Sequence, residues 1–166
     1  SKDQRPTTKD YFLIVSRLVP YKKIDLAIKV FNKLGSPLKI VGTGIEENRL
    51  KRMAKSNIEL LGYLTDKELV EYYKGCQALI FPGEEDFGLT IIEAQSFGKP
   101  VIAFRAGGAQ ESIIDGKTGI FFEVQSEKSL EDAILKFQKM NWAFFDAEFV
   151  DGSPCTSKSQ WPRQML

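Results

Sequence analysis

Short apolar runs alternate with amphipathic stretches along most of the chain. The apolar runs have the length and composition of buried strands, whereas the stretches between them repeat apolar residues with helical spacing. Ile24, Ala27, Ile28 and Phe31, for example, fall on one helix face. Strands are therefore predicted at 11–15, 38–41, 58–61, 78–81, 101–104 and 120–122. Helices are predicted at 24–34, 45–55, 65–73, 89–97, 109–114 and 130–140, the third with a capping box at Thr65 and Glu68.

This alternation predicts an α/β fold. Continuous apolar strands separated by helices are typical of a parallel sheet that is covered on both faces. We expect a Rossmann-like, doubly wound parallel sheet of about six strands, with helices on both faces. Ligands of such sheets bind outside the carboxyl ends of the strands. The candidate functional loops are therefore 16–23, 42–44, 62–64, 82–88 and 105–108.

The periodic pattern defines one domain and a tail. Residues 1–140 carry the alternation, whereas 141–166 contain aromatic residues without a clean period or helix caps. We predict a single domain at 1–140 and an irregular tail of uncertain structure at 141–166. The polar start without an initiator Met or apolar core favours a fragment or a processed chain without a signal peptide.

Composition narrows the chemistry. With 23 basic and 22 acidic residues the net charge is +1, which gives no general attraction to nucleic acid. The 2 cysteines are too few for a disulfide framework and favour a cytoplasmic setting. The chain has 0 histidines, so a mechanism that uses a histidine base or a histidine-bound metal needs another chain or domain.

Two loops carry candidate phosphate-binding residues. Arg17, Lys22 and Lys23 follow the first strand, where they form either a diphosphate clamp or a solvated basic loop. Gly42 and Gly44 follow the second strand, where they allow a ligand to approach the backbone or form a plain turn. The second loop is not a complete dinucleotide fingerprint, because position 47 is occupied by glutamate.

The segment 81–95 has the strongest chemical character. It places three acids, at 84–86, directly before Gly88, which opens a helix that contains Glu93. The free amides of Gly88, Leu89 and Thr90 at the helix start favour an anion such as phosphate. Acids beside a phosphate fit a ligand in which hydroxyl groups flank a diphosphate, such as a sugar nucleotide. Alternatively, the acids only complement the helix dipole.

Five segments together resemble a known family. In chain order they read SRLVPYKK, KIVGTGIEENRL, LLGYLTDKELVEYY, FPGEEDFGLTIIEAQSFGKPVIA and GGAQESIIDGKTGIFF. They resemble the C-terminal, donor-binding domain of glycosyltransferase family 4 (group 1), whose members are retaining enzymes of the GT-B fold. The resemblance covers about 11–140, includes the family's paired glutamates as Glu85 and Glu93, and looks closest to a mannosyltransferase-like branch.

The resemblance implies roles for individual residues. Arg17 and Lys22 would hold the donor diphosphate and stabilise its departing charge, and Glu85 would contact the donor sugar. Together these three are the expected catalytic residues. Glu93 would bind the ribose hydroxyls. The remaining donor-binding residues would be Gly42, Gly44, Gly62, Tyr63, Leu64, Phe87, Gly88, Leu89 and Thr90, of which Gly62, Tyr63 and Leu64 would edge the base.

The resemblance also implies an activity and its partners. The expected function is transfer of a hexose, with mannose from GDP-mannose as the first candidate, to a glycan or lipid-linked acceptor. No metal and no cofactor are expected besides the nucleotide sugar, and nucleic acid is not an expected partner. An N-terminal acceptor-binding domain of the same polypeptide would complete the enzyme. We expect a cytoplasmic enzyme that is peripheral at the inner face of the membrane when complete.

Two positions depart from the family pattern. Lys23 stands where many members have glycine, and Asp86 replaces a second common glycine. The added negative charge of Asp86 would alter sugar preference. A non-catalytic, Rossmann-like nucleotide-binding or assembly module and a GT-B sugar-nucleotide epimerase remain alternatives.

Overall fold

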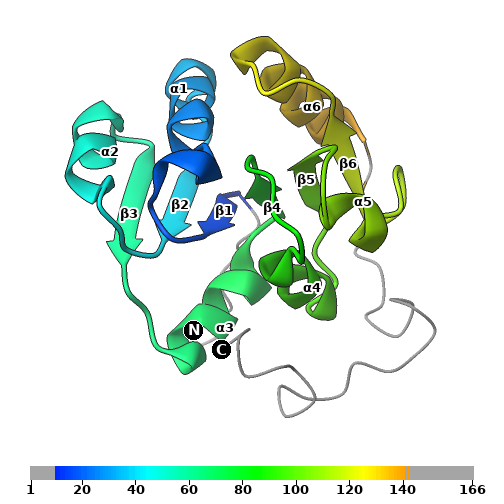
Figure 1. Ribbon diagram of the computed structural model, residues 1–166, viewed down its shortest axis with the longest axis horizontal. Coiled ribbons are helices and arrows are strands. Elements are labelled where there is room, and N and C mark those ends of the chain that lie inside the picture. The colour runs from blue at the N-terminus through cyan, green and yellow to red at the C-terminus, as the bar shows by residue number, and fades with distance from the viewer. Residues whose placement is uncertain (1–9, 141, 143–166) are drawn as a thin grey trace, which may run out of the picture.

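The computed structural model describes residues 10–140 and Trp142 (Figure 1). The predicted tail at 141–166 therefore lies outside the described residues, except for Trp142. The strands are β1 (Phe12–Val15), β2 (Leu38–Val41), β3 (Ile58–Gly62), β4 (Ala78–Phe81), β5 (Val101–Phe104) and β6 (Gly119–Phe122). The helices are η1 (Pro20–Lys22), α1 (Ile24–Leu34), α2 (Glu47–Met53), α3 (Asp66–Gly75), α4 (Leu89–Ser96), α5 (Ala109–Ser112) and α6 (Glu127–Lys139). None of the helices in this part of the chain has the length and hydropathy needed to cross a membrane.

The six strands form one parallel sheet in the order β3-β2-β1-β4-β5-β6. The predicted α/β, Rossmann-like sheet is confirmed. The strand order reverses between β1 and β4, which pair through Phe12 with Ala78 and Leu13 with Leu79. At such a reversal the loops that follow the two central strands diverge and leave room for a ligand.

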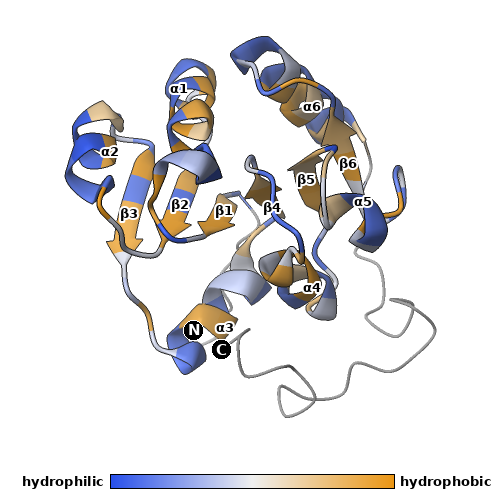
Figure 2. Ribbon diagram, in the orientation of Figure 1, coloured by the Kyte–Doolittle hydropathy of each residue, from blue (hydrophilic) through white to orange (hydrophobic). Residues whose placement is uncertain are grey.

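Helices cover both faces of the sheet, as predicted. Figure 1 shows α1, α2 and α6 on one face and α3 and α4 on the other. The buried residues divide in the same way. Phe12 and Ile14 belong to the core under α1 and α6, whereas Leu13 belongs to the core with Tyr73 of α3 and Ile91 of α4. Because successive strand residues point to opposite faces, a four-residue strand such as β1 contributes to both cores. Hydrophobic residues accordingly make up most of the strands, whereas the helices carry both hydrophobic and hydrophilic residues (Figure 2).

The predicted elements match the structure in place, and the differences are at their ends. Helix α1 has the predicted bounds, and the capping box at Thr65 is present. Helix α6 begins at Glu127 rather than at 130, because the Ser126 side chain caps it by accepting a hydrogen bond from Ser129 N. The single turn η1 was not predicted, although Pro20 at its start has the fixed φ that such a turn needs.

Candidate functional site

Two open clefts lie at the carboxyl ends of the strands. We call the first the apolar cleft. It has a volume of about 330 Å³ and is lined by the loops after β1, β2 and β3 and by the starts of α3 and α4. Its lining residues are Val15, Ser16, Arg17, Val41, Gly42, Thr43, Tyr63, Leu64, Asp66, Leu69 and Thr90. The second, the acidic cleft, has a volume of about 360 Å³ and is lined by Tyr21, Lys22, Glu84, Glu85, Asp86, Phe87 and Leu89.

The apolar cleft has the character of a nucleoside site. Valine and leucine side chains form part of its wall, and the exposed Tyr63 is among its lining residues. The structure brings together here the predicted residues Arg17, Gly42, Tyr63, Leu64 and Thr90. An apolar pocket with a few polar groups at its margin is the usual form of a small-molecule site.

The acidic cleft collects the other predicted residues. Lys22, Glu85, Phe87 and Leu89 all line it, and they come from η1 and from the segment between β4 and α4. Tyr21 also lines this cleft, although sequence reasoning did not single it out. The sequence pointed to Lys22 because of its charge, whereas an exposed aromatic residue between a proline and a lysine gives no comparable indication.

Lys22 and Glu85 form an ion pair across the acidic cleft. Both side chains are largely covered, with 15% and 23% of their surfaces exposed. Burial lowers the pKa of Lys22, and the nearby positive charge of Arg17 lowers it further. Arg17 lines the apolar cleft and Lys22 the acidic cleft. The effect of Arg17 on the pKa of Lys22 shows that the two cations lie near each other. The consecutive residues Leu89 and Thr90 also line one cleft each, so the clefts are neighbours at the start of α4. We call this place the cationic junction; it is suitable for a diphosphate.

The start of α4 adds uncharged donors to the same place. Gly88 occupies the N-cap with φ of 55°, and no side chain caps the helix. The first amide that bonds back is Ile91 N, to Gly88 O at 3.0 Å. Within residues 10–140 the amides of Leu89 and Thr90 have no acceptor, and the buried Thr90 Oγ1 has no partner in the same range. Such a helix start binds anions.

Gly42 and Gly44 lie against the loop that carries Arg17. A Cβ atom on Gly42 would lie 1.7 Å from Ser16 O, and one on Gly44 would lie 2.3 Å from Leu18 O. Only glycine allows this close approach of the two loops. Gly42 also lines the apolar cleft, but Gly44 is not one of its lining residues. The predicted approach to a ligand therefore fits Gly42, whereas for Gly44 the structure favours the plain turn.

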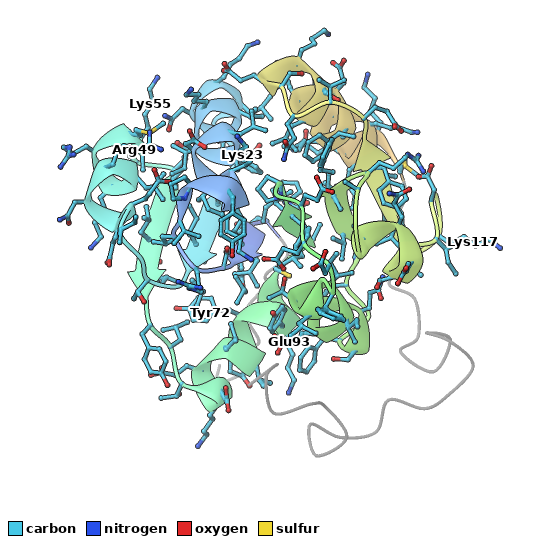
Figure 3. The ribbon with its side chains drawn as sticks, viewed as in Figure 1. Lys23, Arg49, Lys55, Tyr72, Glu93 and Lys117 are labelled. Carbon is cyan, nitrogen blue, oxygen red and sulfur yellow. The ribbon has the colours of Figure 1, made fainter. Side chains whose placement is uncertain are left out.

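Glu93 lies deeper than its predicted role suggests. Its side chain projects from α4 on the face of the sheet that α3 also covers (Figure 3). Only 5% of the residue is exposed, and its Oε2 accepts a hydrogen bond of 2.6 Å from the hydroxyl group of Tyr73. Burial and the Glu93 charge raise the pKa of Tyr73 well above its usual range, so the phenol stays a donor. Thr90, one turn earlier, is the residue of this helix face that lines the apolar cleft.

Gly62 is not among the lining residues of either cleft. Gly62 ends β3 with φ of 70° and leads into Tyr63 and Leu64.

Among the described residues no group of three or more His, Cys, Asp or Glu is placed to hold a metal ion.

The sequence profile of the family described as Glycosyl transferases group 1 matches residues 1–143. The chain belongs to this family. An uncharacterized glycosyltransferase of Methanocaldococcus jannaschii is 33% identical over 132 residues, which are 76% of this chain and 38% of that protein. The GDP-mannose-dependent alpha-mannosyltransferase of Mycobacterium tuberculosis is 34% identical over 131 residues, 78% of this chain and 34% of that protein. The chain thus spans little more than a third of these relatives.

Two solved structures share the fold of this chain. TarM of S. aureus, in a crystal structure that contains UDP, is similar with a TM-score of 0.69 and 26% identity, over 77% of this chain and 28% of that chain. A glycosyltransferase from Rickettsia africae has a TM-score of 0.70 and 26% identity, over 79% of this chain and 38% of that chain. The family match confirms the prediction of a group 1 glycosyltransferase domain, and these structures confirm the predicted fold.

Proposed function

We propose that this chain is the donor-binding domain of a retaining glycosyltransferase that transfers a hexose from a nucleoside diphosphate sugar. The observation that carries the proposal is that two different clefts are neighbours at the uncapped start of α4, with Arg17 in one cleft close to Lys22 in the other. An apolar cleft, a cationic junction and an acidic cleft match in order the base and ribose, the diphosphate, and the sugar of such a donor.

Each part of the donor would meet complementary chemistry. The base would lie against Tyr63 and Leu64, and the diphosphate would accept hydrogen bonds from Arg17, Lys22 and the amides at the start of α4. Glu85 would accept hydrogen bonds from sugar hydroxyls. The ribose would lie over Thr90, with Glu93 and Tyr73 below it as a fixed hydrogen-bonded layer.

The transfer itself needs no histidine in this domain. The bond between the anomeric carbon and the phosphate oxygen breaks, and the diphosphate leaves with the electron pair. The acceptor hydroxyl oxygen forms the new bond from the same face of the sugar, and its proton passes to the departing phosphate. Arg17, Lys22 and the α4 amides stabilise the charge that develops on the diphosphate. We expect neither a catalytic metal nor a cofactor. We expect the acceptor, a glycan or a lipid-linked molecule, to bind to another domain of the polypeptide.

Mannose from GDP-mannose is our first candidate donor. In its support, two mannosyltransferases that are GDP-mannose-dependent, from Mycobacterium tuberculosis and Corynebacterium glutamicum, are 34% and 30% identical to this chain. A glycogen synthase of Pseudomonas aeruginosa is 32% identical, however, and the TarM structure contains UDP. The donor base therefore has to be measured.

Calorimetric titration of this chain with GDP, UDP and ADP tests the proposal. We expect binding of a nucleoside diphosphate, with GDP the tightest of the three. Guanosine without phosphates is the matched control, and it should bind more weakly because it leaves the cationic junction empty. If none of the three diphosphates binds at millimolar concentration, the proposed function is wrong.

A further inference from the structure

We propose that Glu85 competes with the diphosphate for Lys22 and thereby promotes release of the nucleoside diphosphate after the sugar has been transferred. The inference rests on the proposed function, and it gives Glu85 a second role besides contact with the donor sugar. The observation behind it is that Lys22, the cation at the diphosphate position, is already paired with Glu85.

The backbones that carry the pair are held in place. A Cβ atom on Gly83 would lie 2.9 Å from Lys22 Cα and 2.9 Å from Lys22 O, so the segment after β4 packs directly on η1. On the other side, Gly108 N donates a hydrogen bond of 2.7 Å to Glu85 O. A Cβ atom on Gly107 would lie 2.3 Å from the same oxygen. With both backbones held in place, the pair is made or broken by rotation of the Lys22 and Glu85 side chains.

Glu85 differs in this from its acidic neighbours. Glu84 and Asp86 also line the acidic cleft and are exposed, but neither forms an ion pair with a cation within residues 10–140. Removing Asp86 therefore removes the same charge from the same cleft without removing a partner of Lys22. This makes Asp86→Asn a matched control for Glu85→Gln.

Competition for Lys22 links product release to the state of the sugar. A donor that still carries its sugar offers hydroxyl groups to Glu85. When the Glu85 carboxylate binds these hydroxyls, Lys22 is free to bind the phosphates. After transfer the hydroxyls are gone, and the carboxylate turns back to Lys22 and weakens its contact with the β-phosphate. Product release limits the turnover of many enzymes. A residue that makes the enzyme bind the product less tightly than the donor therefore raises the rate of the cycle.

The test is calorimetry of the chain with GDP and with GDP-mannose, or with UDP and UDP-glucose if the nucleotide panel favours uridine. Glu85→Gln should bind GDP about fivefold more tightly, because no ion pair has to be broken. Its affinity for GDP-mannose should rise less or fall, because hydroxyl groups bond more weakly to an amide than to a carboxylate. The preference for GDP-mannose over GDP should therefore drop. Asp86→Asn, in contrast, should leave the affinity for GDP itself within about twofold of the original, because Asp86 forms no ion pair with Lys22.

A double-mutant cycle shows whether Lys22 carries the effect. In a Lys22→Ala background, Glu85→Gln should no longer tighten GDP binding. The inference is overturned if Glu85→Gln leaves GDP affinity unchanged, if it tightens GDP and GDP-mannose equally, or if Asp86→Asn tightens GDP binding as much as Glu85→Gln does. If the unmodified chain binds no nucleotide at all, the proposed function fails first, and this role of Glu85 fails with it.

Discussion

Lys23 adopts a left-handed backbone conformation, with φ of 58° and ψ of 33°, where η1 meets α1. Among the described residues it is the one non-glycine residue with positive φ. A residue with a side chain costs about 1–2 kcal/mol in this left-handed conformation, and glycine avoids that cost. Glycine also loses more conformational entropy on folding, which offsets part of the gain. Lys23→Gly should therefore raise the free energy of unfolding by about 0.5–1 kcal/mol, as measured by urea denaturation.

The control for Lys23→Gly removes the same side chain from a regular helix. Lys29 is exposed within α1, where glycine is unfavourable by about 1 kcal/mol. Lys29→Gly should lower the free energy of unfolding. If both substitutions lower it, the strain assigned to Lys23 is absent.

Arg17 distinguishes a donor site from an idle Rossmann-like module. Arg17→Ala should weaken GDP binding about tenfold, because a charge-assisted contact to phosphate is lost. Arg52, exposed on α2, is outside both clefts. Arg52→Ala removes the same charge and should change the dissociation constant less than about twofold. Equal affinities of the two variants, measured by calorimetry, would favour the non-catalytic module.

Tyr73 and Glu93 form a buried pair that the sequence alone did not indicate. Tyr73→Phe removes the donor to Glu93 and leaves that carboxylate with one partner fewer, which should lower the free energy of unfolding by about 1–3 kcal/mol. The adjacent Tyr72 provides the control, since its hydroxyl makes no hydrogen bond within the described residues. Tyr72→Phe should be close to neutral in the same urea titration; a comparable loss in both variants would speak against the Tyr73 bond.

At the scale of elements, the start of α6 depends on one side chain. Ser126 accepts a hydrogen bond from Ser129 N, so a helix amide that would otherwise lack a partner is satisfied. Ser126→Ala should lower the free energy of unfolding by about 1 kcal/mol. Hydrogen exchange should be faster in the first turn of α6 and unchanged in α1. Ser56→Ala, in an exposed turn, is the control, and an effect as large there would contradict the capping role.

The strands and helices were predictable where local pattern determines them. Buried parallel strands read as continuous apolar runs, and α1 has a regular apolar face, so these elements were placed almost to the residue. The start of α6 was placed too late, because a serine cap without a glutamate three residues later is a weak signal. Contacts between segments, such as Lys22 with Glu85 and Tyr73 with Glu93, depend on packing and leave no local trace. The loops of the site were predictable from topology, whereas these pairs were not.

At the scale of the whole molecule, the two clefts lie on both sides of the point where the strand order reverses. The apolar cleft uses the loops after β1, β2 and β3, and the acidic cleft uses η1 and the segment after β4. A nucleotide sugar that occupies both would connect the two halves of the sheet. Binding of such a ligand would therefore stabilise the whole domain as well as the loops that contact it.

Thermal unfolding in the presence of nucleotide tests this connection. A ligand at about 100 times its dissociation constant stabilises the folded state by about 2.7 kcal/mol. For a chain of this size that corresponds to a rise in Tm of about 5–10 °C. Hydrogen exchange should slow with GDP in the loops 16–23 and 82–88, which lie on opposite sides of the reversal, and remain unchanged in the turn between α5 and β6. Guanosine at the same multiple of its own dissociation constant should raise Tm equally, since mass action alone sets that shift, but should slow exchange only around the apolar cleft. If GDP also protects only the loops of that cleft, the diphosphate does not bridge the two halves of the sheet.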